Sequence, residues 1–196
     1  METLIKDKTN RQIQKEQTRA KLIARAESLF AKQGIGNTTT AEIAKSLKLS
    51  HATVFIHFPT REDLILAVVD KFAERLSAEL GQRCSSDMSL KEMLKAHLSV
   101  LSEFEDFYLR LISESQSLPP AIRGQVYTMN ASLSYRFFRA GQELVKSLEH
   151  KKLTQPVFFN TWMALLHYAI MNRDLFSDQT PILKHNGEDL IRQFLT

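Results

Sequence analysis

Cysteine, glycine and proline are scarce in this chain of 196 residues, and each scarcity excludes a class of protein. The single cysteine, Cys84, rules out an internal disulfide framework and suits a reducing cytoplasm. Six glycines and five prolines disfavour all-β folds with many turns and favour long helices. Hydrophobic residues make up 43% of the chain, which is enough for a folded core.

The sequence also lacks a long apolar run. No stretch reaches the roughly 18 uncharged apolar residues that a membrane span needs. The longest apolar segment, Thr161 to Met171, is better interpreted as a buried helix. Residues 1–17 are polar and have no apolar centre, so they do not form a signal peptide. We therefore expect a cytoplasmic protein with no membrane association.

Patterns typical of catalysis or metal binding are missing as well. No nucleophile–base pair and no phosphate-binding loop is recognisable, and the histidines at 97, 150, 167 and 185 do not have the spacing of metal ligands. We therefore expect no catalytic residues, no metal and no cofactor, and a protein that is not an enzyme.

Positive charge is concentrated in the first third of the chain. Residues 1–60 contain 10 Lys and Arg and 5 Asp and Glu, a balance of +5, whereas residues 61–196 contain 16 and 17, a balance of −1. Excess positive charge on one segment suits contact with phosphate groups, although an ordinary solvated surface has the same composition.

The most informative stretch, residues 39–64, predicts two short helices, a tight turn between them, and then a third helix. Thr39 and Glu42 form a capping box at the start of the first helix. Ser50 is a good cap for the second helix, which Pro59 ends. The second helix keeps only Val54 and Phe58 on its inner side. This arrangement is typical of a helix-turn-helix that enters the DNA major groove.

Residues 38–65, TTTAEIAKSLKLSHATVFIHFPTREDLI, resemble the DNA-binding region of the TetR family of transcriptional regulators. Family members have threonines before the first helix, Ile-Ala within it, and Ser-x-Gly-Thr-Leu-Tyr-x-Tyr-Phe in the second. The chain shares Ser50, Thr53, Phe58, Pro59 and the run Glu62 to Leu64. It departs from the family at Lys48 and Ala52, where Gly is preferred, at Phe55 and His57, where Tyr is usual, and at Arg61, which replaces Lys.

The resemblance implies an all-α fold with two continuous parts. Residues 1–60 would be a helix-turn-helix DNA-binding domain with a mobile arm at 1–14, and residues 61–196 a helical domain for effector binding and dimerisation. The protein would be a repressor whose homodimer binds a near-palindromic operator in double-stranded DNA. The residues expected to contact DNA are Thr39, Thr40, Ser50, His51, Ala52, Thr53, Phe55, His57 and Arg61.

Hydrophobic periodicity extends the helical prediction along the whole chain. It predicts helices at about 15–33, 61–83, 90–101, 102–117, 121–150, 154–173 and 187–195, with a loop over 176–186. The helix at 154–173 is apolar nearly all round, so it must be covered on both sides. Because little chain follows it, we expect a dimer interface on the last two helices, formed by Phe158, Trp162, Leu165, Leu166, Leu190, Ile191 and Phe194.

TetR-like proteins usually release DNA when a small molecule binds, which implies a largely apolar effector pocket. The aromatic, methionine and histidine residues expected to line it are Phe104, Tyr108, Phe137, Trp162, Met163 and His167. Two other functions remain open from the sequence: a helical enzyme or small-molecule carrier with no role on DNA, and a helical scaffold that binds a protein partner.

Overall fold

The computed structural model describes residues 9–84, 88–142, 154–176 and 179–195. Within these ranges the chain forms helices and no strand, so the all-α prediction is confirmed. None of the helices described is long and apolar enough to cross a membrane.

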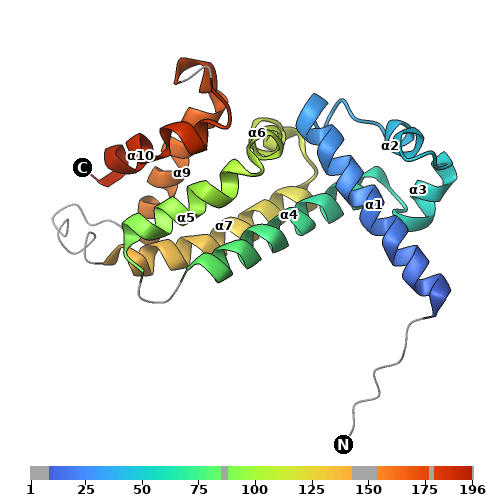
Figure 1. Cartoon of the computed structure of the whole chain (residues 1–196), viewed down its shortest axis with the longest axis horizontal. Helices are drawn as coiled ribbons and strands as arrows, with labels where there is room; N and C mark the ends of the chain where they lie inside the picture. The colour runs from blue at the N-terminus through green and yellow to red at the C-terminus, as the bar shows by residue number, and fades with distance from the viewer. Residues whose placement is uncertain (1–8, 85–87, 143–153, 177–178, 196) are drawn as a thin grey trace, which may run out of the picture.

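The first three helices form a small compact unit at one end of the molecule, which we name the head (Figure 1). They are α1 (Asn10–Gln33), α2 (Thr40–Ser46) and α3 (His51–His57). Helix α1 begins five residues before the predicted start, because Thr9 and Gln12 form a capping box that the sequence analysis overlooked. Residues 10–14, expected in a mobile arm, therefore belong to α1, and residues 1–8 lie outside the described part.

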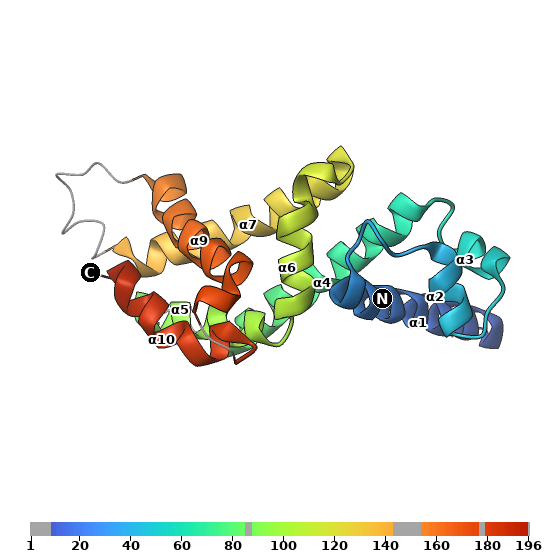
Figure 2. The same cartoon turned by 90° about the horizontal axis from the view of Figure 1, so that it is seen from above.

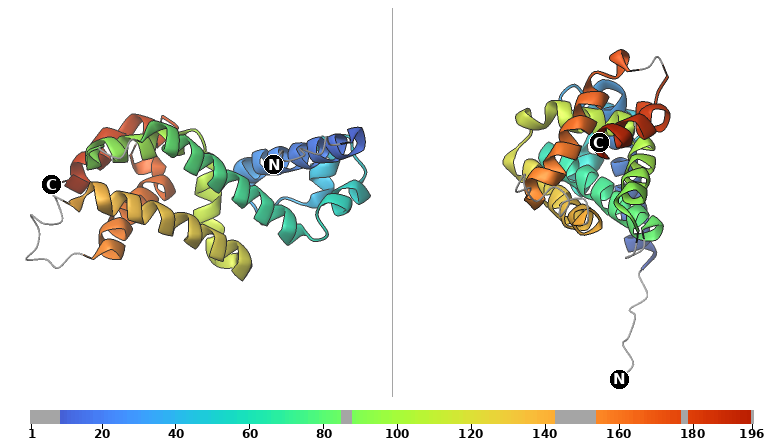
Figure 3. Two further views of the ribbon diagram at one scale, coloured as in Figure 1. Left: turned by 90° about the horizontal axis from the view of Figure 1, so that it is seen from below. Right: turned by 90° about the vertical axis from the view of Figure 1, so that its left-hand side faces the viewer.

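Helix α4 (Arg61–Arg83) joins the head to the rest of the molecule, which we name the body, as Figure 3 shows. Its predicted limits are confirmed, and its first turn is closed by a capping box between Thr60 and Asp63. The same helix packs against α1 in the head and against α5 and α7 in the body. Because α4 continues without a break between the two parts, it can carry a displacement from the body to the head, which a flexible linker could not.

The body contains α5 (Leu90–Ser102), α6 (Glu105–Glu114), the short 3₁₀ helix η1 (Ser115–Ser117), α7 (Pro120–Ala140), α9 (Gln155–Met171), η3 (Arg173–Leu175) and α10 (Ile182–Leu195). Helix α6 crosses the molecule where body and head meet (Figure 2) and packs against α1. The prediction of a helix over 121–150 is confirmed as far as Ala140, and residues 143–150 of that prediction lie outside the described residues.

Helix α10 starts five residues earlier than predicted, inside the segment expected to be a loop. The buried carboxylate of Glu105 accepts hydrogen bonds of 2.9 Å from the backbone N–H groups of Ile182 and Leu183. This carboxylate caps the first turn of α10 from a position 77 residues earlier in the chain. Gly187, predicted to begin the helix, lies within it, where a Cβ would come 3.0 Å from Leu98 Cδ1.

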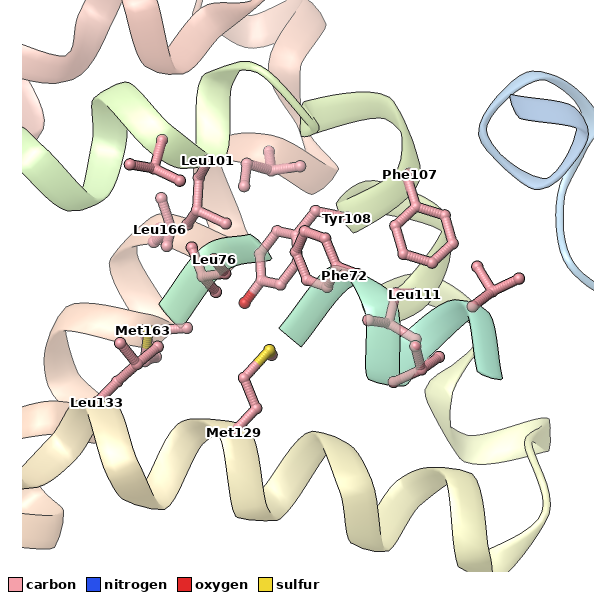
Figure 4. Packing of buried hydrophobic residues seen from close by; sticks show 14 of the residues in the cluster. Phe72, Leu76, Leu101, Phe107, Tyr108, Leu111, Met129, Leu133, Met163 and Leu166 are labelled. Carbon is pink, nitrogen blue, oxygen red and sulfur yellow. The ribbon is translucent and has the colours of Figure 1, made fainter. Parts of the chain in front are cut away.

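One hydrophobic core runs from the head through the body. Phe72 of α4 lies at its centre, with ring centroids 5.3 Å from Phe107 and 6.0 Å from Tyr108 of α6 (Figure 4). Deeper in the body, the Trp162 indole N–H donates to His97 Nδ1 at 3.2 Å. Both side chains are almost completely buried, and burial, with a smaller contribution from nearby His167, lowers the pKa of His97 to about 3.

Candidate DNA interface and ligand cavity

Helix α3 is held in the head by two buried residues and one cap. Val54 and Phe58 are at most 2% exposed, which confirms the predicted inner side of the helix. Ser50 caps the helix by accepting a hydrogen bond from the Thr53 N–H at 3.1 Å. The turn before it places Lys48 at φ 57°, in the left-handed region, which explains why the TetR pattern prefers glycine at this position.

The outer face of α3 is exposed and carries His51, Ala52 and Phe55, which are among the residues expected to contact DNA. A hydrogen bond of 2.8 Å joins His51 Nε2 to Thr40 Oγ1 of α2, and the His51 and Phe55 rings pack edge to face at 4.9 Å. These contacts fix the direction in which His51 points. Ile56, 69% exposed on the same short helix, was missed by the sequence analysis. The exposure of Ile56 could have been predicted, because Val54 and Phe58 occupy the inner side of the helix and leave Ile56, next to Phe55, on the outside.

Three of the hydroxyls expected to contact DNA, those of Thr39, Ser50 and Thr53, already have partners within the head. Thr39 Oγ1 accepts from the Glu42 N–H and donates to the Glu42 carboxylate, which also accepts from the Thr39 backbone N–H. The backbone hydrogen bond, followed by that of the hydroxyl, lowers the pKa of Glu42. The Ser50 and Thr53 hydroxyls lie 2.8 Å apart and share a hydrogen bond. These side chains therefore fix the starts of α2 and α3, and each keeps acceptor or donor capacity for one further contact.

His57 lies at the end of α3 beside the positively charged start of α1. Burial lowers the pKa of His57, and the charges of Lys15 and Arg19 lower it further. The Arg19 guanidinium lies 4.8 Å from the ring centroid of Phe58. This edge of the head thus holds two cations and a neutral imidazole, which together favour the approach of an anion.

Arg61, expected to contact DNA, binds the loop between α1 and α2 in this structure. Its guanidinium donates to the carbonyl oxygens of Ile35 and Thr38. The same loop is held from the other side by Glu114, whose carboxylate accepts from the N–H groups of Ile35 at 3.0 Å and Gly36 at 2.6 Å. Glu114 lies at the end of α6, so this contact joins the body to the head.

Glycine at 34 makes room for that carboxylate. A Cβ at Gly34, where φ is 96°, would come 2.8 Å from the Glu114 Oε1 atom. We name Gly34 to Thr38, together with Arg61 and Glu114, the loop clamp. No local sequence pattern predicts this role of Glu114, because its partners lie 78 and 79 residues away.

A cavity of about 150 Å³ lies in the body between α6, η1, α7 and α9. Of the six residues expected to contact a ligand, only His167 lines it, and Tyr108 supports His167 through a hydrogen bond of 2.8 Å between its hydroxyl and Nε2. Phe104 lines a separate groove of about 430 Å³ that also contains Glu27 and Arg75. The remaining three, Phe137, Trp162 and Met163, are buried in the core.

The residues expected at a dimer interface are mostly inside the subunit. Phe158, Trp162, Leu166, Leu190 and Ile191 are at most 4% exposed, and Leu165 and Phe194 are half-buried. This corrects the expectation that too little chain remains to cover α9, because α10 is longer than predicted and packs on it. The Phe194 ring lies 5.3 Å from that of Trp162 and 5.4 Å from that of Phe158.

One stripe of α9 remains exposed instead. Val157, Tyr168 and Met171 are 50–57% exposed, and Ala164 lies between them on the same face of the helix. This stripe is the apolar surface of α9 that remains exposed in the single subunit. As for metals, the residues described contain no group of three or more His, Cys, Asp or Glu side chains that would hold an ion.

Comparison with known proteins adds to this geometry. Residues 22–68, covering the second half of α1 to the first turns of α4, match the family described as bacterial regulatory proteins, tetR family. The chain is 32% identical over 88 residues to the HTH-type transcriptional repressor Rv3405c of Mycobacterium tuberculosis, covering 45% of this chain and 46% of that one. It is 39% identical over 67 residues to the HTH-type transcriptional regulator LuxR of Vibrio harveyi, covering 34% and 33%. The chain therefore matches less than half the length of these curated relatives.

The likeness extends to the body at the level of the fold. A TetR-family transcriptional regulator from Agrobacterium tumefaciens superposes with a TM-score of 0.73 at 18% identity, covering 92% of this chain and 97% of that one. The head-and-body arrangement is thus shared, while the side chains that line the body differ. The helix-turn-helix motif and the match over residues 22–68 together show that this chain belongs to the TetR family of bacterial regulatory proteins.

Proposed function

We propose that the protein is a transcriptional repressor whose homodimer binds a near-palindromic DNA operator and leaves it when a small, largely apolar effector binds the body. The observation that carries this proposal is the outer face of α3. His51, Ala52, Phe55 and Ile56 are exposed on a short helix that two buried residues and a cap hold rigidly. A rigid helix with small, aromatic and hydrogen-bonding groups facing outward fits the major groove.

In this proposal the contacts divide into those that read sequence and those that position the protein. His51, oriented by Thr40, would meet a base edge, and Ala52 or Ile56 would meet a thymine methyl group. Lys15, Arg19 and His57 at the edge of the head would meet phosphates. Arg61 would act through the loop clamp rather than on DNA, because its guanidinium is bound to backbone carbonyls.

Two heads are needed to read two half-sites, and the exposed stripe of α9 supports dimerisation. Pairing the stripe with its copy would cover Val157, Ala164, Tyr168 and Met171 from water. The two copies of α3 would then lie about 34–36 Å apart, or a multiple of that distance, to enter successive major grooves on one side of the duplex.

Fluorescence anisotropy with labelled DNA fragments flanking the protein's own gene tests the proposal. At least one fragment should bind about 1,000-fold more tightly than a shuffled sequence of the same length. His51→Ala should change sequence preference by about 1–3 kcal/mol at one base pair of each half-site. His185→Ala is the matched control, because His185 is an exposed histidine on α10, away from the head. Failure of every fragment to bind better than the shuffled sequence would refute the operator proposal.

A further inference from the structure

We propose that the cavity between α6, η1, α7 and α9 binds a small carboxylic acid with an apolar body of about one ring. The inference rests on the proposed function, since the acid would be the effector. The inference narrows the effector from any largely apolar molecule to a single chemical class. Three properties of the cavity support this class: its volume, the positive charge at its lining, and its unused hydrogen-bonding groups.

The volume limits the ligand to a small molecule. A cavity of about 150 Å³ lined by apolar side chains is large enough to hold a benzene ring. Here the apolar lining comes from Leu111 and Ile112 of α6, Leu118 just after η1, and Val126 of α7. A single aromatic ring or a short branched chain fills this space.

Charge at the lining favours an anion. Arg123 of α7 lines the cavity, and its guanidinium donates a hydrogen bond of 3.3 Å from Nη1 to the Gln116 carbonyl oxygen. Among the residues that the structure describes, no Asp or Glu forms an ion pair with Arg123. The guanidinium therefore keeps donors in a planar fork, which matches the two oxygens of a carboxylate.

Two further polar groups line the same cavity. Asn130 Oδ1 is buried and has no hydrogen-bond partner within the described part of the chain. Because a buried amide without a partner costs free energy, a ligand that supplies one is favoured. His167 also lines the cavity, and burial lowers its pKa so that the imidazole is neutral.

The tautomer of His167 follows from its partner. Burial raises the pKa of the Tyr108 phenol, which therefore stays protonated and satisfies its buried O–H by donating to Nε2 of His167. The imidazole proton is then on Nδ1, which remains as the donor that His167 offers to a ligand. An acid that also carries a hydroxyl, such as a hydroxybenzoate, would use both Asn130 and His167.

Isothermal titration calorimetry on the full-length chain tests the inference with benzoate and its neutral isostere benzamide. Benzoate should bind with a Kd of about 1 mM or below, as expected for a ligand of this size. Benzamide should bind about tenfold more weakly, because it lacks the charge that Arg123 recognises. 4-Hydroxybenzoate should bind at least as tightly as benzoate.

Variants of the chain test whether the probes bind in the cavity or respond only to the overall charge of the protein. Arg123→Gln should weaken benzoate about tenfold and leave benzamide unchanged, and Arg123→Lys should fall between because it keeps the charge without the fork. Arg136→Gln is the matched control, since Arg136 is an exposed arginine on the same helix. Leu118→Trp, which fills the cavity, should abolish binding of both probes, with circular dichroism confirming that the variants remain folded.

Three results would overturn the inference: no heat with any of the probes, equal affinities for benzoate and benzamide, or equal weakening by Arg123→Gln and Arg136→Gln. Operator binding, measured without acid, keeps the two proposals apart. If benzoate binds as expected and no operator is found, the repressor function fails alone. If an operator is bound and benzoate is not, the ligand class fails alone.

Discussion

The loop clamp makes Glu114 the residue whose replacement tells most about how body and head communicate. Its carboxylate accepts two backbone N–H groups of the α1–α2 loop, at 3.0 Å from Ile35 and 2.6 Å from Gly36. In Glu114→Gln one oxygen is retained and the other becomes an NH₂ group that faces an N–H donor. The variant therefore loses one charge-assisted hydrogen bond and weakens the second.

The magnitude follows from these contacts. Hydrogen bonds to a charged group contribute about 1.5–3 kcal/mol each, and the partial exposure of this site favours the lower end of that range. We expect Glu114→Gln to lower the free energy of unfolding by about 2 kcal/mol, which for a chain of this length lowers Tm by roughly 4–8 °C. Glu114→Ala, which removes both hydrogen bonds, should cost about 3 kcal/mol.

Urea unfolding and operator titration measure the two consequences separately. Ser115, the next residue, lines the ligand cavity, so the clamp lies between the ligand and the head. If ligand binding normally weakens operator binding about 5- to 150-fold, the ratio should shrink towards one in Glu114→Gln. Asp189→Asn is the control, because it removes a carboxylate whose ion pair with Arg192 is highly exposed and contributes little.

The reasoning would be refuted by a Glu114→Gln variant that unfolds at the wild-type urea midpoint. A variant that is destabilised as expected and yet keeps the full effect of ligand on operator affinity would show that the clamp only stabilises the fold. Signal transmission would then run through α4 alone.

Four other outcomes are expected. Lys48→Gly should raise the free energy of unfolding by about 0.5–1 kcal/mol in urea titrations, because Lys48 has φ 57°, and Lys48→Ala should give no gain. Operator affinity should rise as pH falls from about 8 to 6: the pKa of His57 is lowered in the free protein, and nearby phosphate raises it, so DNA binding takes up a proton. His57→Gln should flatten that pH profile, and an unchanged profile would contradict the assignment. Because the pKa of His97 is about 3 in the folded chain and near 6.5 when unfolded, the free energy of unfolding should fall by about 2 kcal/mol between pH 7.5 and 5. His97→Gln should remove most of this loss in urea titrations at the two pH values. Sedimentation should give a particle of twice the chain mass of 22.5 kDa. Tyr168→Glu, which places a charge on the exposed stripe of α9, should shift the equilibrium from dimer towards monomer. A Tyr168→Glu variant that stays dimeric would place the interface elsewhere.

Local features of the chain were sufficient to predict the helix-turn-helix. The capping boxes at Thr39 and Thr60 and the cap at Ser50 each join residues three apart, so their effect on the backbone does not depend on the rest of the fold. The inner positions Val54 and Phe58 follow from the same spacing. The residues named as DNA contacts are placed by these features on or beside the exposed face of α3, and their contacts with DNA remain a prediction.

Contacts between distant parts of the chain decided the features that local sequence patterns do not predict. Glu105 starts α10 through partners 77 and 78 residues away, and this longer helix buries most of the residues expected at the dimer interface. Arg61 and Glu114 meet on one loop although 53 positions separate them in the sequence. Periodicity shows that a side chain faces inward, but only the packed helices determine whether it meets core, cavity or a second subunit, because that depends on which helix lies opposite.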